Sequence, residues 1–149
     1  MAKILSEVMT GKKSVPQPNS AFIERVPVTV ILPAAAPAVN DIISLLELPP
    51  GVELVDFDII APQTDSNGAP TNTLSIGSEN ALGTDLTMVY ETGLTAGRTA
   101  NGSISRSTTA NTLAADKTIA RRIALKVTGA FATYAGAGKT LLVLLHLKA

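Results

Sequence analysis

The sequence predicts an all-β protein, an antiparallel two-layer β-sandwich with about eight strands and almost no helix. Three observations support this prediction. Apolar and polar residues alternate along several segments, as they do in strands with one buried and one exposed face. Clusters of Gly, Pro, Asn and Asp, which favour turns, separate these segments. A final segment, residues 140–148, is apolar on both faces, which is typical of a strand that is covered twice or faces another subunit.

The composition limits the possible classes of protein. A chain of 149 residues suits one domain with its own core, and the absence of cysteine excludes disulfides and thiolate metal sites. The mean hydropathy of +0.30 indicates either apolar surface that binds partners or simply many alanines. No apolar run approaches the roughly 20 residues that span a bilayer, and residues 1–10 lack the apolar core of a signal peptide, so no membrane partner is expected.

Residues 1–20 are predicted to form an extended N-terminal arm, and residues 21–149 the sandwich domain. The stretch 11–20 holds two prolines, two lysines and too few apolar groups to offset the entropy of ordering. A disordered terminus and an arm that becomes ordered on a neighbouring subunit are the two alternatives. In the second, the candidate partner-binding residues of the arm are three lysines and three apolar anchors: Lys3, Lys12, Lys13, Ile4, Leu5 and Val8.

The segments that follow the arm are predicted strands. Residues 22–32 alternate, and Pro27, which cannot donate a hydrogen bond to a neighbouring strand, places this segment at a sheet edge or a bulge. Residues 40–48 fit either a short helix capped by Asn40 or a strand. A strand is favoured because the segment is short and runs directly into two prolines.

Residues 48–78 contain the clearest strand pattern. Val55, Phe57 and Ile59 are predicted to point inward, with Asp56 and Asp58 on the opposite, exposed face. Turn residues at 65–68 then predict a connection to a returning strand at 73–77. Further strands are expected around residues 86–90 and 102–107.

The C-terminal part predicts a second hairpin, with strands at 118–128 and 140–148 joined through a Gly-Ala-Gly turn at 136–138. In the first of these strands Ile123, Leu125 and Val127 are predicted to point inward. In the second strand Leu142 and Leu144 lie on the face opposite the other leucines, so both are candidate partner-binding residues.

Charge is distributed unevenly along a chain whose net charge is zero. Residues 40–91 contain nine acids and no base, whereas residues 92–149 contain eight bases and one acid. Opposite charges can meet across strands of a sandwich, or one charged face can bind an oppositely charged neighbour. Nucleic acid is not an expected partner, because the bases are balanced by acids and aromatic side chains for base stacking are scarce.

Several motifs that could carry chemistry are better explained as structural features. The stretch from Gly136 to Thr140 lacks the first glycine of a phosphate-binding loop, and a strand rather than a helix is predicted after it. His146 is the sole histidine, and the turn at Asp65 lacks a later glutamate at calcium-loop spacing. Asp56 and Asp58 lie on one strand face with no pocket indicated. No enzymatic activity, catalytic residue, cofactor, metal or small-molecule substrate is therefore expected.

The order of these signals resembles the small capsid decoration, or cement, proteins of tailed bacteriophages. The resemblance covers about residues 22–148 and rests on four features: a Leu-Pro-x-Gly turn at 48–51, an alternating strand with outward acids, a Thr-Leu-Ser-Ile-Gly-Ser strand at 73–78, and a C-terminal strand pair. It implies a jelly-roll-like sandwich and a structural, non-enzymatic protein. Such a protein would be made in the host cytoplasm and bind the outer surface of the capsid, commonly as a homotrimer that clamps neighbouring copies of the major capsid protein.

Two other classes of protein stay open. One is another phage structural part, such as a head-fibre base or a tail component, which a fibrous extension would favour. The other is a non-catalytic ligand- or carbohydrate-binding sandwich, which commonly presents exposed aromatic platforms. Aromatic residues make up 3% of this chain, which disfavours the second class.

Overall fold

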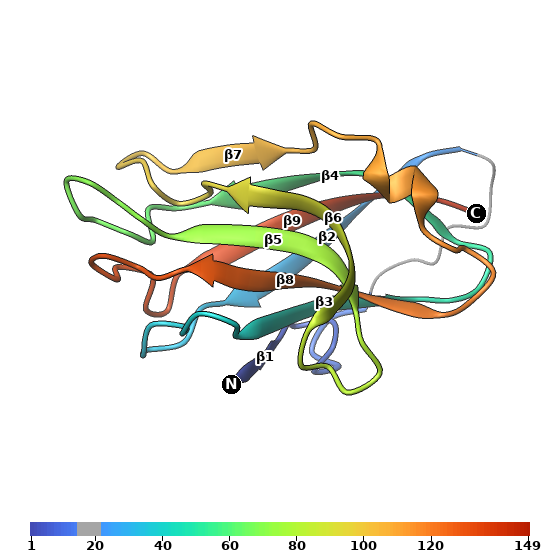
Figure 1. Ribbon diagram of the computed structural model, residues 1–149, viewed down its shortest axis with the longest axis horizontal. Helices are drawn as coiled ribbons and strands as arrows, with labels where there is room; N and C mark the ends of the chain where they lie inside the picture. Colours follow the sequence, from blue (N-terminus) through green and yellow to red (C-terminus); the bar gives the residue numbers. More distant parts are fainter. Residues whose placement is uncertain (15–21) are drawn as a thin grey trace.

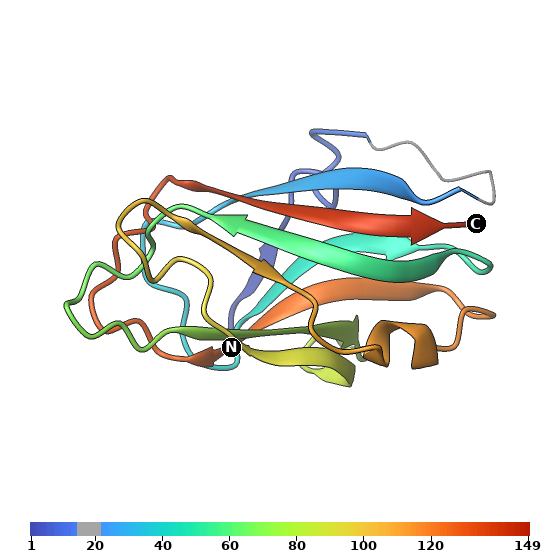
Figure 2. The same ribbon diagram turned by 90° about the horizontal axis from the view of Figure 1, so that it is seen from above.

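Two β-sheets pack face to face as the layers of a sandwich, which Figure 2 shows from above. The computed structural model describes residues 1–14 and 22–149. The regular structure of these residues consists of nine strands and one 3-10 helix: β1 (Lys3–Leu5), β2 (Glu24–Ile31), β3 (Ile42–Leu48), β4 (Glu53–Ala61), β5 (Thr73–Glu79), β6 (Leu86–Leu94), β7 (Ser103–Arg106), η1 (Asn111–Ala114), β8 (Arg121–Gly129) and β9 (Thr140–Lys148). The predicted all-β, two-layer sandwich is confirmed.

One sheet has five strands in the order β1-β3-β8-β5-β6, and the other has four in the order β2-β9-β4-β7 (Figure 1). All neighbouring strands are antiparallel except β1 and β3, which are parallel. The strand at 42–48 confirms the strand interpretation of that segment. Pro27 lies in β2, at an edge of the four-stranded sheet, where its missing amide hydrogen leaves no central ladder position unpaired.

The two predicted hairpins are wrong. β4 and β9 belong to the four-stranded sheet, whereas β5 and β8 belong to the five-stranded sheet. The connections at 62–72 and 130–139 therefore cross between layers, which lie roughly 10 Å apart in a β-sandwich. Each of these strands has an apolar inner face, and its hydrogen-bonded neighbours come from distant parts of the sequence. Alternation assigns the face of a strand but does not identify its neighbour.

The predicted inward residues are buried with one exception. Phe57, Ile59, Ile123, Leu125 and Val127 all have 0% exposure, but Val55 is half-buried. The reason is a β-bulge, because the register of β4 against β9 shifts between Leu54 and Asp56. One extra residue reverses the alternation, so Leu54, with 0% exposure, points inward before the bulge.

Asp65 joins the two loops that cross between the layers. It is fully buried, and its carboxylate accepts backbone N–H bonds from residues 67 and 71 of its own loop and 132 and 133 of the other, at 2.8–3.2 Å. Burial raises the pKa of Asp65, but these four hydrogen bonds outweigh that effect and lower it to about 2. The predicted turn is thus an anchor for the opposite loop.

The acids of the middle of the chain meet the bases of its last part. Ion pairs of 2.7–3.5 Å join acids at 47, 53, 58, 79 and 85 to bases at 122, 117, 106, 122 and 126 respectively. Most of these partners lie on adjacent strands or on the loops beside them. The uneven charge along the sequence is therefore neutralised in part within the fold, in agreement with the first of the two interpretations.

Candidate interaction surfaces

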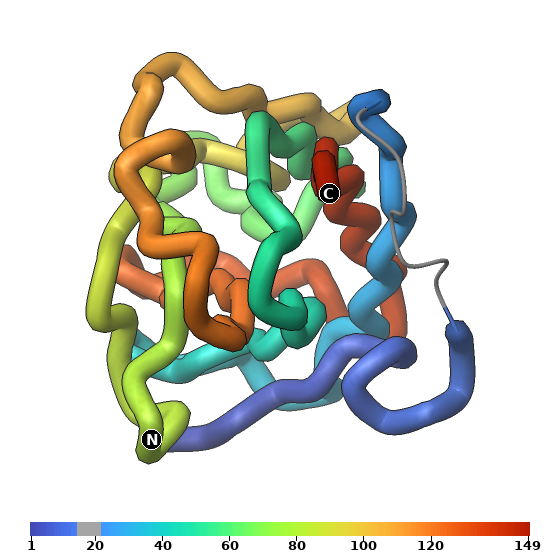
Figure 3. Tube along the Cα trace, turned by 90° about the vertical axis from the view of Figure 1, so that its right-hand side faces the viewer, coloured from blue at the N-terminus to red at the C-terminus, as the bar shows by residue number. Residues whose placement is uncertain are grey.

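The N-terminal segment, residues 1–14, lies along one side of the sandwich, from the β5–β6 loop to β2 (Figure 3). β1 pairs with the edge of β3, and the N–H of Ala2 donates to the Asp41 carboxylate at 2.6 Å. The Lys3 ammonium lies 2.9 Å from the carboxylate of Glu79, whose side chain is 1% exposed. Glu79 also accepts hydrogen bonds from Ser44 and, at 3.5 Å, from Arg122.

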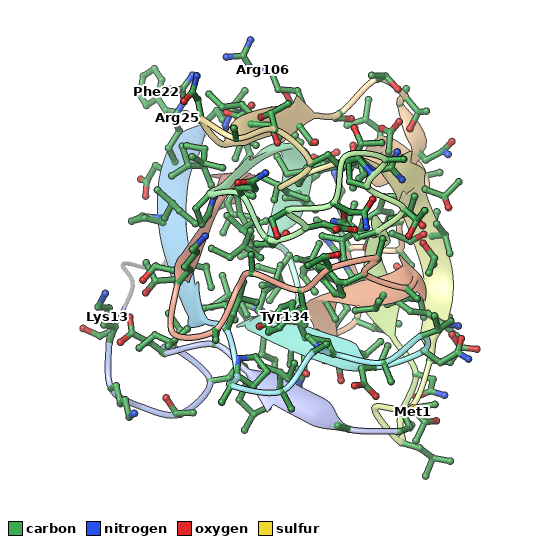
Figure 4. All side chains as sticks on the ribbon, turned by 90° about the vertical axis from the view of Figure 1, so that its left-hand side faces the viewer. Met1, Lys13, Phe22, Arg25, Arg106 and Tyr134 are labelled. Atoms are coloured by element: carbon green, nitrogen blue, oxygen red, sulfur yellow. The ribbon has the colours of Figure 1, made fainter. Side chains whose placement is uncertain are left out.

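After β1 the segment reaches the other sheet. The Glu7 N–H donates to the Thr29 carbonyl of β2 at 3.0 Å, and the Lys13 ammonium lies 2.7 Å from the Glu7 carboxylate. Hydrogen bonds from Lys13 and Thr29 hold the pKa of Glu7 below its usual value. Figure 4 shows Lys13 on the β2 side of the molecule and Met1 on the opposite side. The segment therefore connects the edges of both sheets.

These contacts correct both alternatives for residues 1–14, since the segment is neither disordered nor dependent on a neighbouring subunit for its order. Residues 1–14 are ordered by their own chain, because backbone pairing and buried carboxylates compensate for the few apolar groups; residues 15–20 of the predicted arm lie outside the described residues. Ile4 and Val8 pack against the core and are not exposed anchors. The other four predicted residues of the segment, Lys3, Leu5, Lys12 and Lys13, are exposed.

Leu142 and Leu144 lie half-buried on the outer face of the four-stranded sheet. The inner residues of β2 and β9 are fully buried, so the residues between them face outward. Strand register places further apolar residues on the same face: Ile60 is opposite Leu142, Ile104 is opposite Ile60, and Pro27 is opposite Leu144. We call the set Pro27, Ile31, Ile60, Ile104, Leu142 and Leu144 the apolar band.

The rest of this face is charged. The Asp58 carboxylate lies 3.1 Å from Nε2 of His146 and 3.2 Å from Nε of Arg106. Arg25 of β2 is opposite His146, which in turn is opposite Asp56 of β4. Figure 4 shows Arg25 and Arg106 projecting from the two edge strands. We call Arg25, Asp56, Asp58, Arg106 and His146 the polar flank.

The part of the surface that the structure describes includes two open hollows. One, of about 530 Å³, is lined by Ile60, Ile104 and Leu142 of the apolar band together with Thr140 and residues 101–103. The other, of about 480 Å³, lies at one end of the five-stranded sheet between β5, β6 and the loop at 115–120. Its lining includes Glu79 and Arg122, which already pair with each other, and the side chain of Ile119.

The motifs that the sequence analysis interpreted as structural features have structural contacts in the fold. The loop at 136–139 belongs to the crossing between β8 and β9, and the Lys139 ammonium donates to the Gln63 carbonyl at 2.7 Å. His146 is half-buried on a strand face, where it is paired with Asp58. Among residues 1–14 and 22–149, no group of three or more His, Asp or Glu side chains is placed to hold a metal ion. No helix in those ranges is long and apolar enough to cross a membrane.

Sequence reasoning found two members of the apolar band and missed the others. Ile60, Ile104, Pro27 and Ile31 come from strands far apart in the sequence, and their proximity depends on the strand order. One signal was available for Ile60, which continues the outward alternation of Asp56 and Asp58. Ile104 gave no signal, because β7 is short and lies in a stretch rich in Gly, Ser and Thr.

Comparison with known proteins gives one informative match. No protein-family model and no curated protein matches the sequence. A chain in the solved structure of the capsid of Ralstonia phage GP4 matches with a TM-score of 0.82 and 28% sequence identity. The match covers 99% of this chain and 97% of that chain.

Proposed function

We propose that this chain is a structural protein of a phage virion that binds the outer surface of the capsid and stabilises it as a decoration protein. The observation that carries the proposal is the match to the GP4 capsid chain, which extends over nearly the full length of both chains. A fold alone does not define a function, but likeness over 99% of this chain and 97% of the GP4 chain, with 28% identity, is a stronger indication than a shared architecture. The same likeness supports a non-enzymatic role.

The strand order supports the jelly-roll part of the proposal. Leaving β1 aside, the sheets run β2-β9-β4-β7 and β3-β8-β5-β6, and consecutive strands change layer except at the step from β5 to β6. Two four-stranded antiparallel sheets connected in this way form a jelly roll, an architecture used in viral capsids. β1 is an additional edge strand supplied by the N-terminal segment.

In this proposal the exposed residues of the N-terminal segment contact the capsid. Lys12, Lys13 and Leu5 project from a segment that is itself fixed to both sheets, so little further ordering is needed on binding. A homotrimer would present three such segments to neighbouring major capsid proteins. Simultaneous binding then multiplies a modest affinity of each segment through effective concentration and clamps those neighbours together.

The direct test uses heads of the parent phage prepared without this protein. Purified chain is added, and its position and copy number are determined by cryo-electron microscopy. We expect density on the outer surface of the head and greater resistance of filled heads to heat. Density confined to a tail or a fibre base would assign the chain to another phage structural part, and absence of binding to any virion part would contradict the proposal.

A double charge reversal, Lys12→Glu with Lys13→Glu, is expected to weaken binding to heads roughly tenfold per segment, and more when several segments bind together. The sandwich should keep its fold, because both side chains are exposed and the substitutions remove only the surface contacts of Lys13 with Glu7 and Thr29. Affinity is measured by co-sedimentation with heads at low salt. Lys117→Glu, at an exposed lysine before β8, serves as the control and should bind like the original chain. Equal binding by all three proteins would show that Lys12 and Lys13 do not contact the capsid.

A further inference from the structure

The outer face of the four-stranded sheet has a composition that is unusual for a face in water. Antiparallel sheets commonly have one apolar face in the core and one polar face in solvent. Here the inner face supplies the core, while the outer face carries the six residues of the apolar band. Ile31 and Ile104 are 50% and 55% exposed. All four strands contribute: Leu142, Ile60 and Ile104 lie side by side in one register row, and Pro27 of β2 lies opposite Leu144, the next outward residue of β9. On β2 the residue opposite Leu142 is Thr29, whose hydroxyl binds Glu7 and Lys13 of the N-terminal segment, so the band is interrupted there.

The edges of this sheet are poorly suited to binding a partner by strand addition. Pro27 interrupts the donor pattern of β2, and the Glu7 N–H already occupies the Thr29 carbonyl. β7, at the other edge, has four residues. A partner of this sheet is therefore expected to pack on its face.

We infer that copies of this chain bind one another through the apolar band and its polar flank. This inference rests on the proposed function and identifies the surface that forms its oligomer. Charge complementarity favours a second copy as the partner. Within the flank Arg106 and His146 already lie against Asp58, which leaves one base, Arg25, and one acid, Asp56, to meet the charges of a partner. A surface of a single charge sign would match only one of these two. A second copy of the same face presents apolar groups to the band and both charge signs to the flank.

The hollow of about 530 Å³ requires the second copy to present a protruding group that fits into it. It lies at the Leu142 end of the face, and Ile60, Ile104 and Leu142 line it together with polar residues such as Ser103 and Thr140. A contact that fills it would bury side chains that are half-exposed in the single chain. The polar flank at the other end would then fix the relative orientation of the copies, because like charges placed opposite each other are unfavourable.

The test is the mass of the purified chain and of two variants by size-exclusion chromatography with light scattering. The original chain should have a mass of at least two chains, each of 15.4 kDa. Ile104→Asp should reduce it to the single-chain mass without loss of fold, because the side chain is half-exposed in the single chain. Leu144→Asp, at a half-buried position of the band, should do the same. Val89→Asp is the matched control, since Val89 is a 45% exposed valine on the edge strand of the other sheet, and its mass should stay that of the original.

Three outcomes would overturn the inference: an original chain with single-chain mass at concentrations of tens of micromolar, a multimer that both band variants leave intact, or a multimer that Val89→Asp disrupts equally. Circular dichroism confirms that each variant is folded. Binding of the original chain to heads is measured separately. A single chain that still binds heads would support the proposed function and contradict this interface. A multimer that fails to bind heads would support the interface and contradict the proposed function.

Discussion

Asp65→Ala is expected to lower the free energy of unfolding by about 3–5 kcal/mol, because Asp65 is fully buried and its carboxylate accepts four hydrogen bonds. The substitution leaves four backbone N–H groups without their acceptor, two in each crossing loop. These loops carry the chain between the layers at 62–72 and 130–139, so their loss of order affects both sheets. Urea unfolding monitored by circular dichroism measures the effect.

Asp116→Ala is the control for this experiment. Asp116 also accepts hydrogen bonds, from the backbone and hydroxyl of Thr118, but it is exposed and its contacts stay within one turn. Its replacement should cost less than about 1 kcal/mol. Equal destabilisation by the two substitutions would contradict the role assigned to Asp65 as the anchor between loops.

The same carboxylate gives a defined dependence on pH. The pKa of Asp65 is about 2 in the folded protein, below its value of about 3.9 in an unfolded chain. A lowered folded pKa stabilises the fold above the unfolded value, and this stabilisation is lost as pH falls from about 4 through about 2. The difference in stability between the original chain and Asp65→Ala should therefore shrink by about 2 kcal/mol between pH 6 and pH 2. An unchanged difference over this range would show that the carboxylate is not held in its charged form by the fold.

Local pattern was sufficient to identify most strands but not their neighbours. Pro27 marked an edge strand correctly, because a missing donor excludes a central position wherever the chain runs. The hairpin predictions were wrong because no local pattern distinguishes a turn within one sheet from a connection that crosses between the layers. The loop after β4 contains the expected turn residues, but one of them, Asp65, binds residues 132 and 133 of the other crossing loop. The bulge at Val55 was missed for a related reason, since it is defined by pairing with β9.

The interaction surfaces likewise combine residues that one stretch of sequence identifies with residues that only the strand order brings together. Leu142 and Leu144 were predicted because a strand that is apolar on both faces is visible in one stretch of sequence. Ile60 and Ile104 became their neighbours through the strand order β9-β4-β7. For the N-terminal segment the count of apolar groups gave the wrong expectation. What holds this segment is pairing with β3 and the buried Glu79 carboxylate, and neither can be recognised without the partner strand.

Deleting residues 2–13 is the second prediction with a large effect, and we expect a loss of about 3 kcal/mol in the free energy of unfolding. The deletion removes β1 and so leaves β3 as an open edge. It also removes the ammonium of Lys3 from the nearly buried Glu79 carboxylate, and the N–H of Ala2 from the buried Asp41 carboxylate. The packing of Ile4 and Val8 on the core is lost as well. The free energy of unfolding is again measured with urea.

Lys3→Met separates the ionic part of this effect from the strand. It keeps β1 and its backbone pairing and removes one charge, while Arg122 and Ser44 still bind Glu79. Since an uncompensated buried charge is costly but this one retains Arg122, the substitution should cost about 1–2 kcal/mol, less than the deletion. A truncated chain as stable as the original would mean that residues 1–14 leave the sandwich in solution and act as a free arm, and Lys3→Met would then also be neutral. If instead the two changes cost the same, the ion pair with Glu79 would be the attachment of the whole segment, and the pairing of β1 with β3 would contribute nothing measurable.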